Sequence, residues 1–190
     1  MYTAKDRILM KSNINSIPHN ENPEIEFRII VRMYQEKVIR FISLFVSNRN
    51  ECEELASDVF ISVWNHREVL KEIENLDNYI FIIARNKAIN HLRKTVNPTI
   101  DIDDINLDIY HNTTTNPESI YISREIVDEL NAAINELPHK TKMAFTLVRE
   151  NKMKYKDAAE ILGVTVKTLE KQVASAVEKL KNKIRKSEKF

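Results

Sequence analysis

The side chains with the clearest chemistry in this 190-residue sequence gather near its C-terminus. Lysines, hydroxyls and one amide recur there at the spacing of a helix face; they are Thr165, Lys167, Thr168, Lys171, Gln172 and Ser175. Amides and hydroxyls form hydrogen bonds with base edges in a DNA major groove, and lysines pair with phosphates. The pattern therefore predicts a DNA-reading surface.

Two short amphipathic helices must position that surface. Their apolar stripes are Ala158, Ala159 and Leu162 on the first, and Leu169, Val173, Ala176, Val177 and Leu180 on the second. Between them Gly163, the only glycine in the chain, can adopt positive φ and end the first helix. Thr165 is placed to cap the second helix with its hydroxyl. This is a helix-turn-helix signature, and an ordinary pair of hairpin helices is the alternative.

Basic residues continue beyond this segment. From Lys167 to the C-terminus there are eight basic and three acidic residues, a net charge of +5, whereas the whole chain carries only +1. Nucleic-acid affinity must therefore come from local patches. Lysines that complement the dipole at a helix end explain part of the run.

The composition favours an all-α soluble protein, because 43% of residues are hydrophobic, 30% are charged, and glycine occurs once. Cys52 is the only cysteine and the five histidines are scattered, so we expect no metal site, no cofactor and no enzymatic activity. The longest apolar run, Tyr79–Ala84, is too short to cross a bilayer, and residues 1–22 lack a signal-peptide pattern. A cytoplasmic location is expected.

Helix-start signals divide the chain into two small helical domains joined by a flexible linker. Asn22-Pro23-Glu24 and Asn116-Pro117-Glu118 each place a capping residue before a proline at the first helical position. Helices are expected from there to about Val46, then at 50–64 and 77–94, around a polar interval at 66–75. Later helices are expected over 116–137, from Pro138 to about Glu150, and in the helix-turn-helix. The resulting division is an N-terminal extension at 1–23 without an assigned role, a domain at 24–94, an acidic linker at 95–115, and a domain at 116–190.

Charged groups mark two helices of the first domain. Acidic residues crowd the helix at 50–64, namely Glu51, Glu53, Glu54 and Asp58, which indicates either helix-start electrostatics or a docking face for a basic partner. The helix at 77–94 presents amides and arginines, namely Asn78, Arg85, Asn86, Asn90 and Arg93. A solvated helix face would look similar. Because a helix-turn-helix follows in the same chain, however, this set predicts a second DNA contact.

Three motifs together resemble the bacterial extracytoplasmic-function sigma factors, in the style of those from Bacteroides. They are Glu53-Glu54-Leu55-x-x-Asp58-Val59-Phe60-x-x-Val63-Trp64, then Tyr79-Ile80-x-x-Ile83-Ala84-Arg85-Asn86-x-Ala88-Ile89-Asn90-x-Leu92-Arg93, and Leu137-Pro138 with the helix-turn-helix. The resemblance implies a promoter-specificity subunit whose partners are core RNA polymerase, promoter DNA and an anti-sigma factor.

The same resemblance implies residue roles. The first domain would bind the polymerase clamp helices through Glu54, Ser57 and Asp58, and open the minus-ten element with the loop at 66–75 and the amide and arginine set. The second domain would read the minus-thirty-five element. Phe60 and Trp64 match core positions.

Four positions depart from the family pattern. Ser57 stands where glutamine is usual, which puts one polymerase hydrogen bond in doubt, and Ala158 replaces an isoleucine of the core. Lys154 replaces a serine or threonine cap. Asn151 replaces a glycine, although asparagine tolerates the left-handed conformation. The competing function is a one-component transcription regulator with an N-terminal sensing or dimerisation domain.

Overall fold

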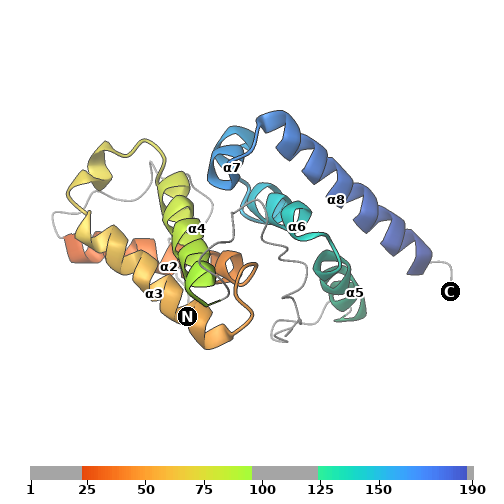
Figure 1. Ribbon diagram of the computed structural model, residues 1–190, viewed down its shortest axis with the longest axis horizontal. Helices are drawn as coiled ribbons and strands as arrows, with labels where there is room; N and C mark the ends of the chain where they lie inside the picture. Colours follow the sequence, from red (N-terminus) through yellow and green to blue (C-terminus); the bar gives the residue numbers. More distant parts are fainter. Residues whose placement is uncertain (1–22, 96–123, 188–190) are drawn as a thin grey trace, which may run out of the picture. The chain divides into compact units, whose positions relative to one another are not determined.

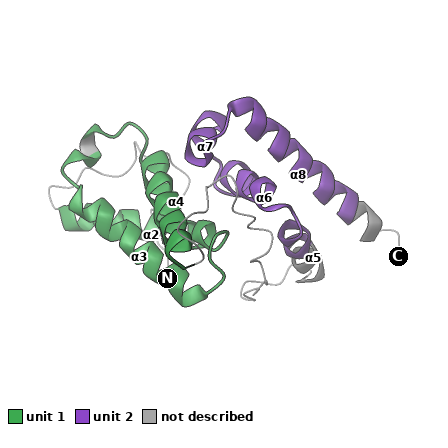
Figure 2. Cartoon of the chain, in the orientation of Figure 1, with its two compact units in different colours: residues 1–99 green, residues 100–190 purple. Residues whose placement is uncertain are grey.

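The computed structural model describes residues 23–95 and 124–187 of the chain. Every regular element in these ranges is helical (Figure 1). The chain divides into two compact units, Met1–Thr99 and Ile100–Phe190 (Figure 2). The expectation of an all-α protein with two helical domains is confirmed. The predicted extension, the predicted caps at Asn22 and Asn116, and the predicted linker beyond residue 95 lie outside the described residues.

Unit 1 is built from three helices that all contact one another: α2 (Pro23–Ile42), α3 (Arg49–Asn65) and α4 (Leu76–Thr95). The apolar stripes of the sequence form its core, in which the largest fully buried side chains are Ile30, Val38, Phe41, Ile42, Val59, Val63, Ile80 and Phe81. Phe41 packs edge-on against Phe45 and Phe81, with ring centroids 5.4 and 5.3 Å apart. The helices match the predicted ranges closely, except that α2 ends at Ile42 and continues as a hydrogen-bonded turn.

The polar interval before α4 contains a 3₁₀ helix, η2 (Val69–Glu72), which the sequence did not indicate. Phe60 is buried, as expected for a core position. Trp64 is only half-buried: it packs against Phe27 at 4.9 Å between centroids, and the Arg67 guanidinium lies 4.7 Å from its ring centroid.

Polar contacts fix α4 against its neighbours. The hydroxyl of buried Tyr34, on α2, donates a hydrogen bond to Asp77 at the start of α4. Burial, together with the negative charge of Asp77, raises the pKa of Tyr34 far above its ordinary value, so the hydroxyl remains a neutral donor. At the other end of α4, His91 Nε2 lies 3.0 Å from Glu51 Oε2 of α3.

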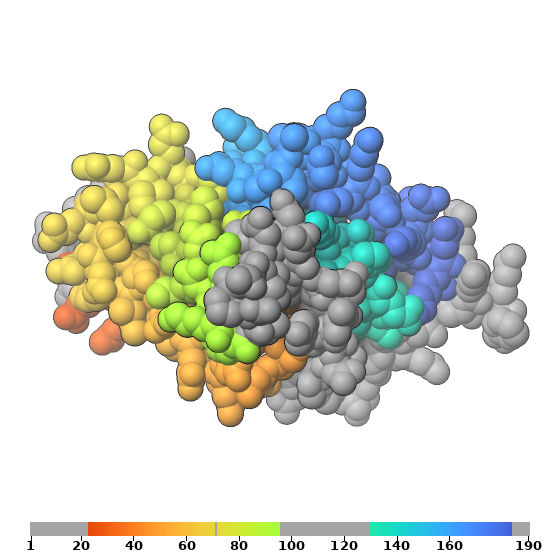
Figure 3. Space-filling model, viewed as in Figure 1, coloured from red at the N-terminus to blue at the C-terminus, as the bar shows by residue number. Residues whose placement is uncertain are grey.

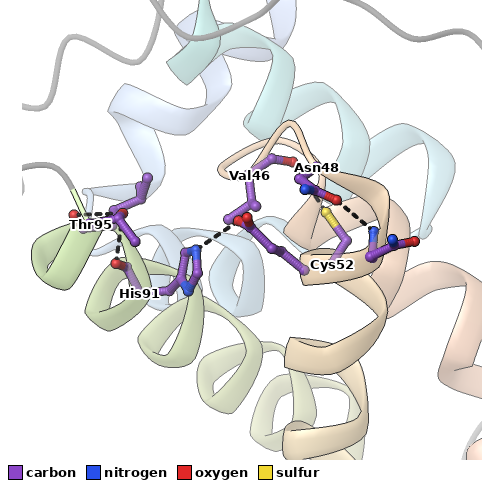
Figure 4. A network of polar contacts seen from close by, with 8 residues as sticks. Val46, Asn48, Cys52, His91 and Thr95 are labelled. Atoms are coloured by element: carbon purple, nitrogen blue, oxygen red, sulfur yellow. Dashed lines mark hydrogen bonds and ion pairs between the residues drawn. The ribbon is translucent and has the colours of Figure 1, made fainter.

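The lone cysteine lies beside that second contact (Figure 4). The thiol of Cys52 is buried and donates to the carbonyl of Val46 at 3.1 Å. Burial raises the pKa of Cys52 to about 11, and the negative charges of Glu51 and Glu53 make smaller contributions in the same direction. The thiol is therefore protonated and unreactive at neutral pH. Asn48 begins α3 by accepting the backbone N–H of Asn50 at 2.9 Å.

Unit 2 contains α5 (Arg124–Asn135), α6 (His139–Phe145), a π-helical turn η4 (Thr146–Glu150), α7 (Tyr155–Leu162) and α8 (Val166–Ser187). Helix α8 contacts α5, α6 and α7, so the unit is assembled around it. One apolar cluster joins α5 to α8 through Ala133, Leu137, Ala176 and Leu180.

Two lysines add polar links around α5. Lys183 of α8 forms an ion pair with Glu136. Lys142 of α6 is buried and donates to Asn135 Oδ1 at 2.7 Å. Burial lowers the pKa of Lys142, and the nearby charge of Glu150 opposes that effect.

The left-handed residue before α7 is Lys152, and not Asn151, which stands at the usual glycine position of the family. Asn151 has φ −85°, whereas Lys152 has φ 57°. The reason is the π-helical turn, in which the N–H of Asn151 still bonds the carbonyl of Thr146 at 2.9 Å. The chain therefore leaves the helix one residue later. A residue with a Cβ pays about 1–2 kcal/mol for this conformation.

We predict that Lys152→Gly stabilises unit 2 by about 0.5–1 kcal/mol, because it removes that penalty at the cost of a more flexible unfolded chain. Urea denaturation followed by circular dichroism measures the change. The control is Lys156→Gly, which replaces an exposed lysine within α7 and should destabilise by about 0.5–1 kcal/mol. Destabilisation by both substitutions would contradict the assigned strain.

Candidate nucleic-acid interface

The turn between α7 and α8 sets the start of the second helix. Gly163 has φ 68° and ψ 31°, as the sequence predicts. Its N–H bonds the carbonyl of Glu160 at 3.1 Å, and the N–H of Val164 reaches back to the carbonyl of Ala159 at 3.0 Å. This six-to-one bond is the Schellman closure of a helix C-terminus.

Thr165 caps α8, also as predicted. Its Oγ1 accepts the backbone N–H of Thr168 at 3.1 Å and lies 2.8 Å from the Oγ1 of Thr168. The Thr165 hydroxyl therefore accepts a backbone N–H that has no partner within the helix, and the two threonine hydroxyls form a hydrogen bond with each other. Ala158 and Ala159 are buried under this turn, where small side chains allow α7 and α8 to approach closely.

The solvent-facing side of α8 differs in part from the predicted reading surface. Thr165, Lys167, Thr168 and Lys171 are exposed, whereas Gln172 and Ser175 are half-buried. Gln172 lies three residues after the fully buried Leu169, on the flank of the apolar stripe, and its Oε1 is shielded from solvent without a hydrogen-bond partner among the described residues. The structure thus brings together four of the six predicted residues on the exposed face.

Three exposed residues in the first three turns of α8 were left out of the predicted reading surface. They are Val166, with 40% of its surface exposed, Glu170 and Ala174. The sequence prediction selected uncharged polar and lysine side chains by type, and it therefore passed over an acid and two apolar residues. The helical period would have placed all three opposite or beside the buried stripe. The residues of α7 and α8 form a continuous surface in the space-filling view (Figure 3, blue).

The predicted residues of α4 fall into two groups. Asn86 and Asn90 are exposed and Arg93 is half-buried, and their spacing places them on one face. Asn78 and Arg85 are half-buried nearer the core; the backbone N–H of Asn78 donates to Asn75 Oδ1 at 3.0 Å.

The side of α4 that carries Asn86 and Asn90 also includes two apolar residues. Tyr79 and Ile83 are only half-buried, and they precede Asn86 and Asn90 at the spacing of one helix face. An aromatic ring, an aliphatic side chain and two amides thus follow one another along the helix. The sequence prediction did not include them, because it selected polar and charged side chains only.

The acidic face of α3 carries Glu54, Ser57 and Asp58, all exposed. The Ser57 hydroxyl donates to the carbonyl of Glu53 at 2.8 Å, within its own helix. Asp58 lies 3.8 Å from the Nζ of Lys87 on α4. Ile61, one turn after Asp58, is 57% exposed and was not predicted.

No helix in the described ranges is long and apolar enough to cross a membrane. Among the same residues, no group of three histidine, cysteine or acidic side chains is arranged to hold a metal ion.

Known proteins are similar to this chain in sequence. Residues 30–97 match Sigma-70 region 2, and residues 128–180 match Sigma-70 region 4. The ECF RNA polymerase sigma-E factor of Haemophilus influenzae is 28% identical over 83% of this chain and 87% of its own length. The sigma-E factor of Escherichia coli K12 is 25% identical over 83% and 86%. The expected likeness to Bacteroides sequences is not tested by these relatives and stays a prediction.

Two solved structures share the fold. The sigma factor RpoE of Bartonella quintana, in complex with the anti-sigma factor NepR, has a TM-score of 0.66 and 21% identity, covering 84% of this chain and 97% of its own. CnrH, in complex with the cytosolic domain of CnrY, has a TM-score of 0.52 and 16% identity, covering 95% and 97%. The matches to regions 2 and 4 together span more than half of the chain. The chain therefore belongs to the sigma-70 family of RNA polymerase sigma factors, and within it to the extracytoplasmic-function type.

Proposed function

We propose that the two units divide promoter recognition between them. In this proposal residues 24–94 bind core polymerase and open the minus-ten element, residues 116–190 read the minus-thirty-five element, and residues 95–115 connect them. The observation that supports it most is that the match to region 2 falls within unit 1 and the match to region 4 within unit 2. A one-component regulator is not favoured, because the residues it would use for sensing are those that match region 2.

In unit 2 the proposed reading element is α8. The first turns of a recognition helix enter the major groove, and here they expose Lys167, Thr168 and Lys171 after a tightly closed turn. The hydroxyl would reach base edges, and the lysines would pair with phosphates. Thr165 supports them as the cap. Gln172 and Ser175 are proposed to contribute from the flank, with a smaller exposed surface.

In unit 1 the proposed minus-ten surface is the exposed side of α4. Amides such as Asn86 and Asn90 can form hydrogen bonds with bases that have left the duplex, and an aromatic ring such as Tyr79 offers a stacking surface. Arg93 would pair with a phosphate. Asn78 and Arg85 are proposed to contribute from the flank of the same helix.

We predict that Asn86→Ala with Asn90→Ala reduces promoter opening about 10- to 100-fold, if each lost hydrogen bond to a base costs roughly 0.7–1.4 kcal/mol. Permanganate reactivity of minus-ten thymines measures opening by the reconstituted holoenzyme. Asn131→Ala, an exposed amide on α5, is the matched control. Wild-type opening by the double variant would remove this face of α4 from the proposal.

The proposed polymerase-docking face is the exposed side of α3. Interfaces gain most of their affinity from a few buried anchors within a polar rim. Ile61 has the exposed apolar surface of an anchor, and Glu54, Ser57 and Asp58 have the character of a rim. The acids would favour a basic partner surface.

We predict that Glu54→Arg weakens binding to core polymerase at least about tenfold, because like charges then face each other. Fluorescence anisotropy of the labelled protein measures the affinity, and circular dichroism checks folding. Glu54 is a cleaner test than Asp58, since reversing Asp58 would also place two cations beside each other at Lys87. Glu36→Arg, an exposed acid on α2, is the control and should bind normally. Equal affinities for both variants would contradict the docking face.

We propose an anti-sigma factor as a third partner. The support is that the two solved structures named above are complexes, one with the anti-sigma factor NepR and one with the cytosolic domain of CnrY.

We place the protein in the cytoplasm, because its proposed partners, core polymerase and the chromosome, are there in bacteria.

A further inference from the structure

One exposed acid on the recognition helix has no role in the surface described so far. Glu170 lies on α8 three residues after Lys167 and next to Lys171, and all three side chains are exposed. It is the only acidic residue in the first three turns of the helix. Within the described part of the chain, no ion pair involves it.

Ordinary helix electrostatics does not account for an acid here. Acids stabilise the first turn of a helix, and Glu170 is the fifth residue of α8, beyond that turn. Its only cationic neighbour at helical spacing is Lys167, which precedes it in the less favourable order, and the two are not paired in the structure.

A carboxylate on a DNA-facing helix is repelled by phosphates unless it meets a hydrogen-bond donor. In the major groove the bases offer two such donors, the amino groups of cytosine and adenine. The adenine amino group stands beside N7, an acceptor that repels a carboxylate, whereas cytosine carries only a C–H at the neighbouring position of its ring. Of the four bases, cytosine therefore suits a carboxylate best.

We propose that Glu170 determines promoter specificity by accepting a hydrogen bond from the N4 amino group of a cytosine in the minus-thirty-five element. The inference rests on the proposed function, because it requires α8 to lie in the major groove. Lys167 and Lys171 flank the carboxylate and would pair with phosphates on either side, which offsets its repulsion. Glu170 thus supplies sequence discrimination, and the lysines supply affinity.

The test uses the full chain with core polymerase on promoters that carry each of the four bases at each minus-thirty-five position. Wild-type protein should prefer cytosine at one position by about 5- to 150-fold. Glu170→Ala should abolish that preference and leave the others unchanged. Glu170→Gln should move the preference at the same position toward adenine, since an amide both donates and accepts. Glu178→Ala, an exposed acid two turns further along α8, should leave every preference unchanged.

A promoter with an altered base then tests whether the N4 amino group of the cytosine is the group that Glu170 contacts. Replacing the selected cytosine by 2-pyrimidinone, which lacks the amino group, should weaken wild-type transcription as much as Glu170→Ala does, and should not weaken the variant further. Wild-type preferences in Glu170→Ala would overturn the inference alone. An equal gain for all sequences, as expected if the acid only repels phosphates, would also overturn it. Failure of the wild-type protein to direct transcription from any promoter would overturn the proposed function and this inference with it.

Discussion

The backbone at Gly163 is the constraint on which the reading surface of this protein depends. At φ 68° a side chain with a Cβ would be strained, and the glycine lets the N–H of Val164 close the end of α7. Two residues later Thr165 caps α8, so the direction and rotation of the second helix are fixed within a very short segment. Because α8 also packs against α5, α6 and α7, its starting point decides which side chains face solvent. The exposed residues of α8 can form one reading surface only because this turn fixes the rotation of the helix.

Unit 1 positions two different surfaces on one small core. The aromatic and aliphatic packing around Phe41 holds α2, α3 and α4 together, and the bond between Tyr34 and Asp77 fixes the start of α4. The proposed docking face and the proposed minus-ten face lie on neighbouring helices, which Asp58 and Lys87 link across 3.8 Å. A partly exposed pair of this kind contributes at most about 1 kcal/mol. The shared core, rather than that ion pair, fixes the position of the docking face on α3 relative to the minus-ten face on α4.

The sequence predicts the parts of this structure that depend on local rules. Apolar periodicity places α3 and α4 almost to the residue, whereas α2 ends at Ile42 instead of near Val46. Glycine and threonine chemistry predicts the turn before α8. The left-handed conformation of Lys152 could not be predicted, because the π-helical turn that precedes it has no residue signature. The contact between Tyr34 and Asp77 joins residues 43 apart in sequence, which periodicity cannot pair. Glu170 was passed over because side-chain type was weighed before position on the helix. The roles assigned to individual residues stay predictions.

The central claim is that α4 and α8 of one chain contact two separate elements of one promoter. A DNA-cleaving reagent attached to a cysteine at position 90 or 171 tests it directly, because buried Cys52, whose pKa is raised to about 11, should not react with the reagent. With core polymerase present, Asn90→Cys should cut near the start site and Lys171→Cys about two helical turns upstream, roughly 20 base pairs away. Cuts at a single place, or in a two-fold symmetric pattern without polymerase, would contradict the account and indicate a dimeric repressor or activator instead.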